Sequence, residues 1–258
     1  KKIYLTPAGT EMLHYSSAIM QQFHEVDEAM GRLKGVSGGT LNVAVISAGD
    51  YFFPRLLAEF TRRYSGVTLN LAVHNREELL HQLSTNQTDL AVMVRPPHEM
   101  DSVNEPFAPH PYVIVAPPSH PLTRKSNIRL SQLANEAFIV RERGSDTWNS
   151  MEEGFAGRLT NLKIAMEIKS TETIKQAVIA GMGIAFLSAH TISLELQVGN
   201  LAVLDVEGFP VMLNWYVVHR KNKRLPPVAE AFKRFLMEEG ANLIEQITNL
   251  KDSGVYKR

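Results

Sequence analysis

Three short segments combine arginine, serine and glycine in a way that suits the binding of a small anion. They are Ser47-Ala48-Gly49, Arg95-Pro96-Pro97 and Arg143-Gly144-Ser145. Each follows the carboxyl end of a predicted strand, where open α/β sheets bind ligands against the free N–H groups of the next helix. The guanidinium groups add donors that fit a carboxylate or a phosphate. Helix caps and surface charge explain each segment alone, but the set predicts an anion site if all three face one cleft.

None of the patterns that would indicate catalysis or metal binding is complete. The run Gly35-Val36-Ser37-Gly38-Gly39 has the letters of a hydrolase nucleophile elbow, but its expected order is helix, loop and strand instead of strand, turn and helix. Gly181-Met182-Gly183 closes a predicted helix, so it is a helix cap and not a dinucleotide fingerprint. The chain has no cysteine, and its nine histidines form no HExxH motif. We therefore expect a protein that binds without catalysis, with no metal and no covalent cofactor.

A regular alternation of predicted strands and helices positions these segments. We predict strands at 41–46, 67–73, 89–94, 112–116, 138–140, 162–168, 184–187 and 213–218, and helices at 56–64, 77–83, 147–157, 171–180 and 229–247. The first part reads βαβαβ, which is typical of a parallel sheet with helices on its faces. The whole pattern predicts two α/β lobes joined by crossings near Pro117 and His219. Lobe I takes residues 39–117 and 219–250, and lobe II takes residues 118–218.

A long helix precedes the two lobes. Thr6 suits the cap of this helix, and Pro7 suits its first position. An apolar seam with heptad spacing follows, interrupted only by Ser16, and a helix with one apolar stripe needs a partner. The apolar members of the seam are Met12, Ile19, Phe23, Val26, Met30 and Leu33. Residues 1–38 are therefore predicted to contain a dimerisation helix, separated from the body by a glycine-rich linker.

Composition excludes several classes of protein. The 258 residues are 44% hydrophobic, enough for a packed core, and 27 basic residues balance 27 acidic ones. Because a chain that neutralises many DNA phosphates usually carries a basic excess, we do not expect this chain alone to bind DNA. No apolar run is long enough to span a membrane and no signal peptide is visible, so we expect a cytoplasmic protein. Since residue 1 is lysine, we also expect the chain to begin partway through a longer gene product, or to have been processed.

Several segments, in the same order along nearly the whole chain, resemble the LysR-type transcriptional regulators. Leu5-Thr6-Pro7-Ala8-Gly9 resembles the segment that leaves the winged helix-turn-helix of that family and enters its linker helix. Asp89-Leu90-Ala91-Val92 with Pro96 resembles the third strand and the turn after it. Ser119-His120-Pro121-Leu122 is similar to the opening of the second lobe, and the segment from Ala177 to Ala185 is similar to the VxxGxGI motif.

Two segments are closer still to the CbbR subgroup, the activators of carbon-fixation (RuBisCO) operons. They run from Ile46 to Pro54 and from Val140 to Ser145. The resemblance implies a two-lobed effector-binding domain of the periplasmic-binding-protein type, preceded by a linker helix. It also implies that the DNA-reading domain lies before residue 1, with only the end of its wing present in residues 1–5. Such regulators pair through linker helices and effector domains, so the expected partners are further copies of the chain, as a dimer or tetramer, and RNA polymerase.

Carried over position by position, the resemblance implies an effector pocket between the lobes. Its residues would be Ser47, Ala48, Asn75, Arg76, Arg95, Pro96, Gly144, Ser145 and Thr171. We expect Arg95 and Arg143 to clamp the anion, and Ser47, Ser145 and Thr171 to orient it. Regulators of the CbbR type respond to phosphorylated metabolites and to NADPH, so one of these is the expected effector. Binding would shift the population of lobe closures and thereby the spacing of the DNA-reading heads.

Two other classes of protein remain open. A solute-binding protein of the same fold, serving a transporter, predicts an exported chain without a dimerising helix. An enzyme on this fold needs a base, a nucleophile and an orienting acid, which these segments do not supply. The missing signal sequence and the heptad seam favour the regulator over both.

Overall fold

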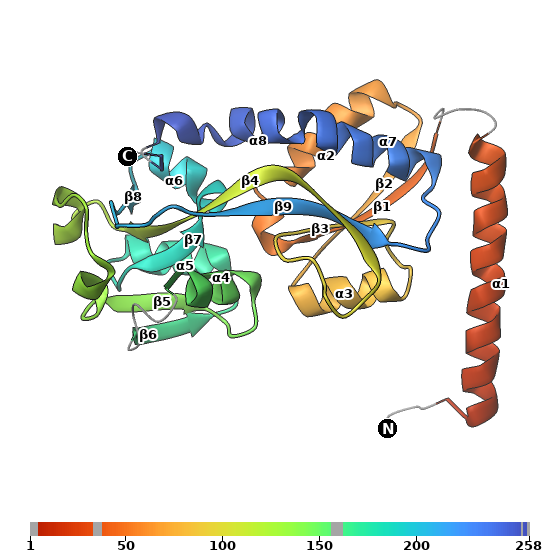
Figure 1. Ribbon diagram of the computed structural model, residues 1–258, viewed down its shortest axis with the longest axis horizontal. Helices are drawn as coiled ribbons and strands as arrows, with labels where there is room; N and C mark the ends of the chain where they lie inside the picture. Colours follow the sequence, from red (N-terminus) through yellow and green to blue (C-terminus); the bar gives the residue numbers. More distant parts are fainter. Residues whose placement is uncertain (1–4, 33–37, 156–161, 254, 257–258) are drawn as a thin grey trace.

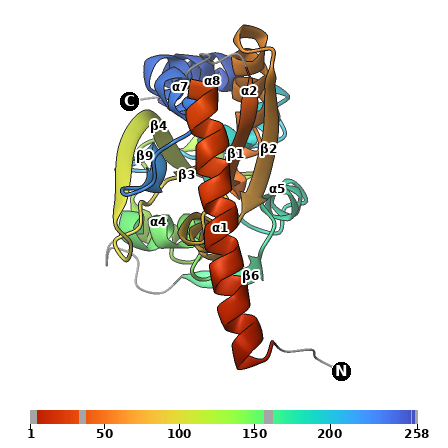
Figure 2. The same ribbon diagram turned by 90° about the vertical axis from the view of Figure 1, so that its right-hand side faces the viewer.

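The computed structural model describes residues 5–32, 38–155, 162–253 and 255–256. Figure 1 shows one helix, α1 (Pro7–Arg32), standing apart from a body whose two halves lie side by side. Figure 2 shows that α1 passes along the body and extends beyond it at its N-terminal end. The helix begins as predicted, because Thr6 Oγ1 accepts a hydrogen bond from the N–H of Gly9 (3.1 Å).

The apolar side chains of α1 are exposed in this single chain. Met12 is 70% exposed, Ile19 53% and Val26 59%. The side chains of Phe23 and Met30, and the whole of Leu33, lie outside the described residues. A solvated apolar stripe on a helix of this length is unfavourable unless another surface covers it.

The first half of the body is built on three parallel strands. β1 (Gly39–Ile46) lies between β2 (Val67–His74) and β3 (Leu90–Met93). The connections are α2 (Phe53–Arg63) and α3 (Arg76–Ser84), which confirms the predicted βαβαβ unit. The carboxyl ends of the three strands therefore lie at one edge of the sheet.

Two long antiparallel strands, β4 (Ser102–Ala116) and β9 (Val211–Arg220), join the halves (Figure 1). At one end β9 pairs with β3, and at the other end β4 pairs with β7 (Ala185–Ser188). A short strand, β8 (Ala202–Val203), also pairs with β4. One sheet therefore runs through both halves.

The strand predicted at 112–116 is the last part of this longer β4. Pro106, Pro109 and Pro111 have no N–H to donate, and for that reason the sequence pattern places the start of the strand at Tyr112. The structure tolerates these prolines because, among the described strands, this part of β4 pairs with β9 alone. A strand with one open edge does not need every N–H.

The pairing also bears on the lobe boundaries at 117/118 and 218/219. Residues 112–115 already pair with β7 of the second half, whereas Val218 still pairs with β3 of the first. We propose that the chain crosses inside the two strands, near Phe107, where the register of β4 shifts, and near Trp215. This proposed division has two lobes, with the boundary moved from 117 to Phe107 on β4 and from 218 to Trp215 on β9.

In the second half, β5, β6 and β7 are each followed by a helix. β5 (Ala137–Arg141) and β6 (Lys163–Ile168) pair in parallel and precede α4 (Asp146–Phe155) and α5 (Thr171–Ile179). The main chain of β5 also bonds to Ile184, just before β7. A short helix, α6 (Ser193–Gln197), follows β7.

The C-terminal helix predicted at 229–247 is divided into α7 (Pro227–Phe235) and α8 (Ala241–Thr248) by a π-helical turn, Leu236–Gly240. Figure 1 shows these helices lying across both halves. A Cβ added to Gly240 would lie 2.8 Å from Cδ2 of Phe107 in β4, so only glycine fits at this point of the π-helical turn without a shift of Phe107. None of the described helices is long and apolar enough to cross a membrane.

The core is continuous through the junction between the halves. Trp215 of β9 stacks on His110 of β4, with ring centres 4.4 Å apart, and Phe52 packs edge-on against it at 5.2 Å. The Trp215 indole donates to Nδ1 of His190 (3.2 Å). Burial lowers the pKa of His190 to about 3, so this imidazole is neutral and accepts that hydrogen bond.

Candidate functional site

The first half brings Arg76 and Arg95 together at the carboxyl ends of its strands. Asn75 caps α3, because its side chain accepts a hydrogen bond from the N–H of Glu78 (2.9 Å). Arg76 follows directly and donates through Nη1 to the main-chain carbonyl of Arg95. Its Nη2 lies 3.5 Å from Oε1 of Glu99. Asn75 is thus used by its own helix, whereas Arg76 connects α3 to the segment after β3.

The turn after β1 lies beside the second half. Ser47 is half-buried and Ala48 is buried in a single 3₁₀ turn, Ser47–Gly49. Two residues later, the hydroxyl of Tyr51 donates to Oε1 of Glu172 (2.5 Å). Glu172 follows Thr171, the first residue of α5. The ends of β1 and β6 therefore meet across the junction.

In the second half, Ser145 caps α4. Its hydroxyl donates to the carbonyl of Glu142 (2.8 Å) and accepts from the N–H of Trp148 (3.1 Å). Gly144 has φ of 84°, in the left-handed region that favours glycine. Arg143 is exposed, and its guanidinium lies 5.2 Å from the centre of the Trp148 ring. Arg143 packs on Trp148 in this structure, which differs from the clamping role expected for it.

Arg141 is the buried arginine of this segment, and the sequence analysis did not select it. It is 7% exposed, and Nε and Nη2 donate to the carboxylate of Glu142 at 2.7 and 2.9 Å. Its Nη1 donates to Oγ1 of Thr171 (3.0 Å), so it joins the end of β5 to the start of α5. A signal was present, because Arg141 directly follows the predicted strand 138–140, just as Arg95 follows the strand at 89–94.

Arg95 reaches from the first half to α4 of the second. Both of its terminal nitrogens donate to the carboxylate of Glu153, Nη2 at 2.6 Å, and Nη2 lies 3.5 Å from Oγ of Ser150. These hydrogen bonds raise the pKa of Arg95 and lower the pKa of Glu153. Because the two residues come from different halves, their pairing depends on how far the halves are closed.

A buried acidic residue lies among these arginines. Asp146, the first residue of α4, is 7% exposed, and neither carboxylate oxygen accepts a hydrogen bond from any described residue. Burial raises the pKa of Asp146 to about 6, against the opposing influence of Arg76, Arg95 and Arg141. The hydroxyl of Tyr112 is also buried and makes no hydrogen bond of ordinary geometry in the described structure, although the side chains of Ser150 and Thr147 lie near it. Burial and the charge of Asp146 raise its pKa, and those two neighbours oppose the rise.

The residues selected from the sequence divide into two groups. Arg76 and Arg95 lie together near the junction, and Thr171 is held there by Arg141. The other selected residues have local roles as caps, turn residues or surface contacts: Ser47, Ala48, Asn75, Pro96, Arg143, Gly144 and Ser145. Asp146 was not selected, because the predicted helix starts at Thr147 and no motif in the sequence marks the residue before it. Among the described residues, no three histidine or acidic side chains are placed to hold a metal ion.

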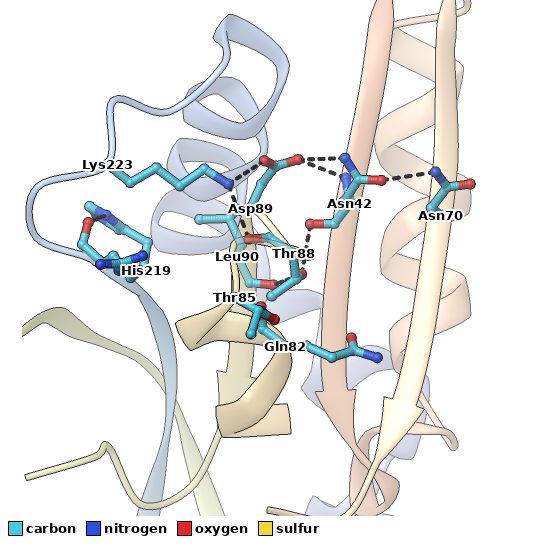
Figure 3. Close-up of polar contacts among 10 residues, drawn as sticks. Asn42, Asn70, Gln82, Thr85, Thr88, Asp89, Leu90, His219 and Lys223 are labelled. Atoms are coloured by element: carbon cyan, nitrogen blue, oxygen red, sulfur yellow. Dashed lines mark hydrogen bonds and ion pairs between the residues drawn. The ribbon is translucent and has the colours of Figure 1, made fainter. Parts of the chain in front are cut away.

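A second buried carboxylate lies at the opposite end of β3, as Figure 3 shows. Oδ2 of Asp89 accepts from the backbone N–H and from Nδ2 of Asn42, both at 3.0 Å, and Oδ1 accepts from Nζ of Lys223 (2.9 Å). The side chain of Asn42 accepts in turn from Nδ2 of Asn70 (2.8 Å), and Thr88 donates to the Asn42 carbonyl (3.0 Å). This cluster binds β1, β2 and the start of β3 to the loop before α7.

Comparison with known proteins agrees with this architecture. The solved regulatory domain of Synechocystis PCC6803 CcmR, in complex with 2-PG, is 40% identical with a TM-score of 0.74, and the match covers 78% of this chain and 96% of that one. Corynebacterium glutamicum OxyR has the same fold, with 19% identity, a TM-score of 0.75, and coverage of 99% of this chain and 80% of that one.

Sequence relatives are closer. The RuBisCO operon transcriptional regulator of Allochromatium vinosum is 45% identical over 243 residues, which are 94% of this chain and 80% of the relative. The HTH-type transcriptional regulator CbbR of Rhodospirillum rubrum is 46% identical over 234 residues, covering 91% and 78%. The resemblance to LysR-type and CbbR proteins and the non-enzymatic interpretation are thereby confirmed. Since residues 34–241 match the LysR substrate binding domain, the chain belongs to that family of transcriptional regulators.

Proposed function

We propose that this chain is the effector-sensing and oligomerisation part of a regulator of carbon-fixation genes, and that a small anionic metabolite binds between its halves. The observation that carries the proposal is the contact of Arg95 with Glu153 across the junction. An anion that takes Arg95 from Glu153 changes the contact between the halves. Arg76 and Arg141 lie at the facing strand ends and add two further donors for the same anion.

A phosphorylated metabolite is the effector that we favour. The CcmR domain, 40% identical to this chain, was solved with 2-PG. The arginines suit the phosphate of a small metabolite, and they suit the phosphates of NADPH as well. NADPH therefore stays in the test as a second candidate, although its nicotinamide and adenine groups require a much longer site.

The mechanism is a shift between closures of the two halves. Without ligand, Arg95 binds Glu153 and Tyr51 binds Glu172, and both of these contacts span the junction. A ligand that replaces Glu153 on Arg95 favours a conformation in which the two halves are closed to a different extent. The size of this shift is set by how much more tightly the ligand binds that conformation than the unliganded one. The two strands that pass through the junction transmit the change to the whole body.

Oligomerisation is proposed to occur through α1. Its exposed seam, which includes Met12, Ile19 and Val26, would pair with the same helix of a second copy as a dimer or within a tetramer. DNA would be bound in the cytoplasm only through a domain before residue 1, and RNA polymerase would be contacted by the assembled regulator. Changes in the body would then alter the spacing of the DNA-reading domains.

Calorimetric titration and thermal denaturation of this chain with 2-PG, ribulose bisphosphate, phosphoenolpyruvate, inorganic phosphate and NADPH test the ligand. A ligand at about 100 times its Kd should stabilise the body by about 2.7 kcal/mol. We expect one phosphorylated metabolite to bind selectively, and Arg95→Ala to weaken it at least about tenfold, since a charge-assisted pair is lost. The exposed Arg124→Ala, with the same change of charge, is the control. Equal binding by Arg95→Ala and wild type would contradict the proposed site.

A further inference from the structure

Asp146 is held in an environment that a carboxylate does not ordinarily occupy. It is 7% exposed at the start of α4, and both of its oxygens lack a hydrogen-bond donor among the described residues. A buried carboxylate without donors is unfavourable by several kcal/mol unless it is neutralised or receives a ligand. A role as a helix-dipole partner alone would not require this burial, because the dipole is equally served by an exposed acid.

The arginines around Asp146 do not satisfy it directly. Arg95 donates to Glu153, Arg141 to Glu142 and Thr171, and Arg76 to the carbonyl of Arg95. Their charges nevertheless lie close enough to lower its pKa. Each arginine therefore already has an acceptor, while the carboxylate in their midst has none.

Other unpartnered atoms surround the same space. Nε of Arg95 is buried without a hydrogen bond within the described ranges, and the buried hydroxyl of Tyr112 has only the poorly aligned side chains of Ser150 and Thr147 near it there. The groups near enough to interact electrostatically with Asp146 are Arg76 from α3, Arg95 after β3, Tyr112 from β4 and Arg141 from β5. Donors and an acceptor without partners are left on both sides of the junction, which is the arrangement expected of a polar site awaiting a small ligand.

An ionised Asp146 would repel an anion in this space, whereas its protonated form would donate a hydrogen bond to it. We infer that Asp146 is the specificity-determining residue of the effector site, and that the anion binds together with one proton taken from solvent onto its carboxylate. The inference rests on the proposed function, since it concerns the same site. The proton returns to solvent when the anion leaves, and no other bond is formed or broken.

This coupling defines the class of ligand. The site accepts a compact oxyanion, phosphate or carboxylate, that can receive a hydrogen bond from the protonated acid while the arginines supply charge. Because burial raises the pKa of the free carboxyl to about 6 and the bound anion raises it further, proton uptake on binding is expected above pH 6. Affinity is therefore expected to fall as the pH rises, up to about tenfold per pH unit for one linked proton.

Isothermal titration calorimetry with 2-PG, from pH 5.5 to 8 in two buffers of different ionisation enthalpy, measures both affinity and proton uptake. A phosphate monoester itself titrates near pH 6, so the decisive quantity is the difference between wild type and Asp146→Asn at each pH. We expect wild type to take up close to one proton more than Asp146→Asn at pH 7.5. We also expect the variant to bind at least about tenfold more tightly than wild type at pH 8, because its amide donates without a proton.

Two further variants keep the test decisive. Glu152→Gln makes the same change of charge at an exposed position of α4 and should behave as wild type. Asp146→Ser, which keeps a residue suited to a helix start, serves if Asp146→Asn does not fold, and should also lose the extra proton uptake. Binding by wild type with proton uptake equal to that of the Asp146 variants would overturn the inference alone. If wild type binds none of 2-PG, ribulose bisphosphate, phosphoenolpyruvate, inorganic phosphate and NADPH at any pH, the proposed function is overturned together with the inference.

Discussion

Two buried carboxylates at opposite ends of β3 have different surroundings. Asp89 lies before the strand, 3% exposed, and accepts hydrogen bonds from Asn42 and Lys223 on both oxygens (Figure 3). Asp146 lies across the junction from the other end of the strand, 7% exposed, and has no hydrogen-bond partner in the described part of the chain. Equal burial therefore does not imply an equal role.

The difference separates a structural carboxylate from one suited to a ligand. Each carboxylate oxygen of Asp89 accepts hydrogen bonds that hold a part of the first half in place. Removing the carboxylate leaves the donors of Asn42 and Lys223 without this acceptor. Asp146 makes no hydrogen bond to any residue that the structure describes, so its burial is a cost in stability that the fold retains. A site that must receive an anion needs groups whose partners are missing until the ligand arrives.

Removal of the Asp89 carboxylate should have the largest effect on stability. Asp89→Ala leaves Lys223 with no ion-pair partner in the described structure and leaves two donors of Asn42 without their acceptor. Breaking a buried pair in this way costs about 3–5 kcal/mol. Urea denaturation at pH 7 measures it, and Asp101→Ala is the control, since its pair with Lys221 is exposed and worth less than about 1 kcal/mol. A loss below about 1 kcal/mol at Asp89 would remove the contrast between the two carboxylates.

Neutralising Asp146 should increase the stability of the protein, which is the opposite of the effect expected for Asp89. Its pKa rises from an ordinary value of 3.8 to about 6 on folding, so stability is full below pH 3.8 and falls as the pH rises to about 6. At 1.36 kcal/mol per unit, the wild type loses about 3 kcal/mol over this range. Asp146→Asn should therefore be more stable than wild type at pH 7.5 and equal to it near pH 4.

The measurement is urea denaturation of both proteins between pH 4 and 8, without ligand. Glu152→Gln, exposed on the same helix, should follow the wild-type pH profile. An Asp146→Asn protein that loses stability at pH 7.5 would show that the carboxylate has a partner and a structural role.

The contrast also explains what the sequence could predict. The parallel unit and the place of Arg95 after β3 follow from strand and helix periodicity, because both depend on neighbouring residues. The length of β4 was underestimated because its prolines are tolerated only at an edge that β9 leaves open. At the division of the C-terminal helix, Gly240 lies against Phe107, a residue distant in the sequence, so the need for a glycine there is not visible from local periodicity.

The candidate site was predicted less completely than the fold. Ser145 was selected from a segment that follows a predicted strand, and Asn75 from the family resemblance, and the structure uses both as caps. Arg141 and Arg143 are two residues apart, and only the packing of Trp148 and Thr171 around them decides which is buried. The lack of hydrogen-bond donors for Asp146 among the described residues could not be predicted from the sequence, because it depends on how residues from distant parts of the chain pack around the carboxylate.

The smallest effect is expected for the pair that spans the junction. Glu153 is 64% exposed, so its pair with Arg95 contributes at most about 1 kcal/mol, and Glu153→Gln should leave stability within that range. Because the substitution frees Arg95, the affinity for 2-PG should rise by up to about fivefold, which is the same free energy expressed as binding. Calorimetry at pH 7 compares it with Glu152→Gln. Weaker binding by Glu153→Gln would mean that Glu153 holds Arg95 in place for the ligand, and the pair would then belong with Asp89 as a structural contact.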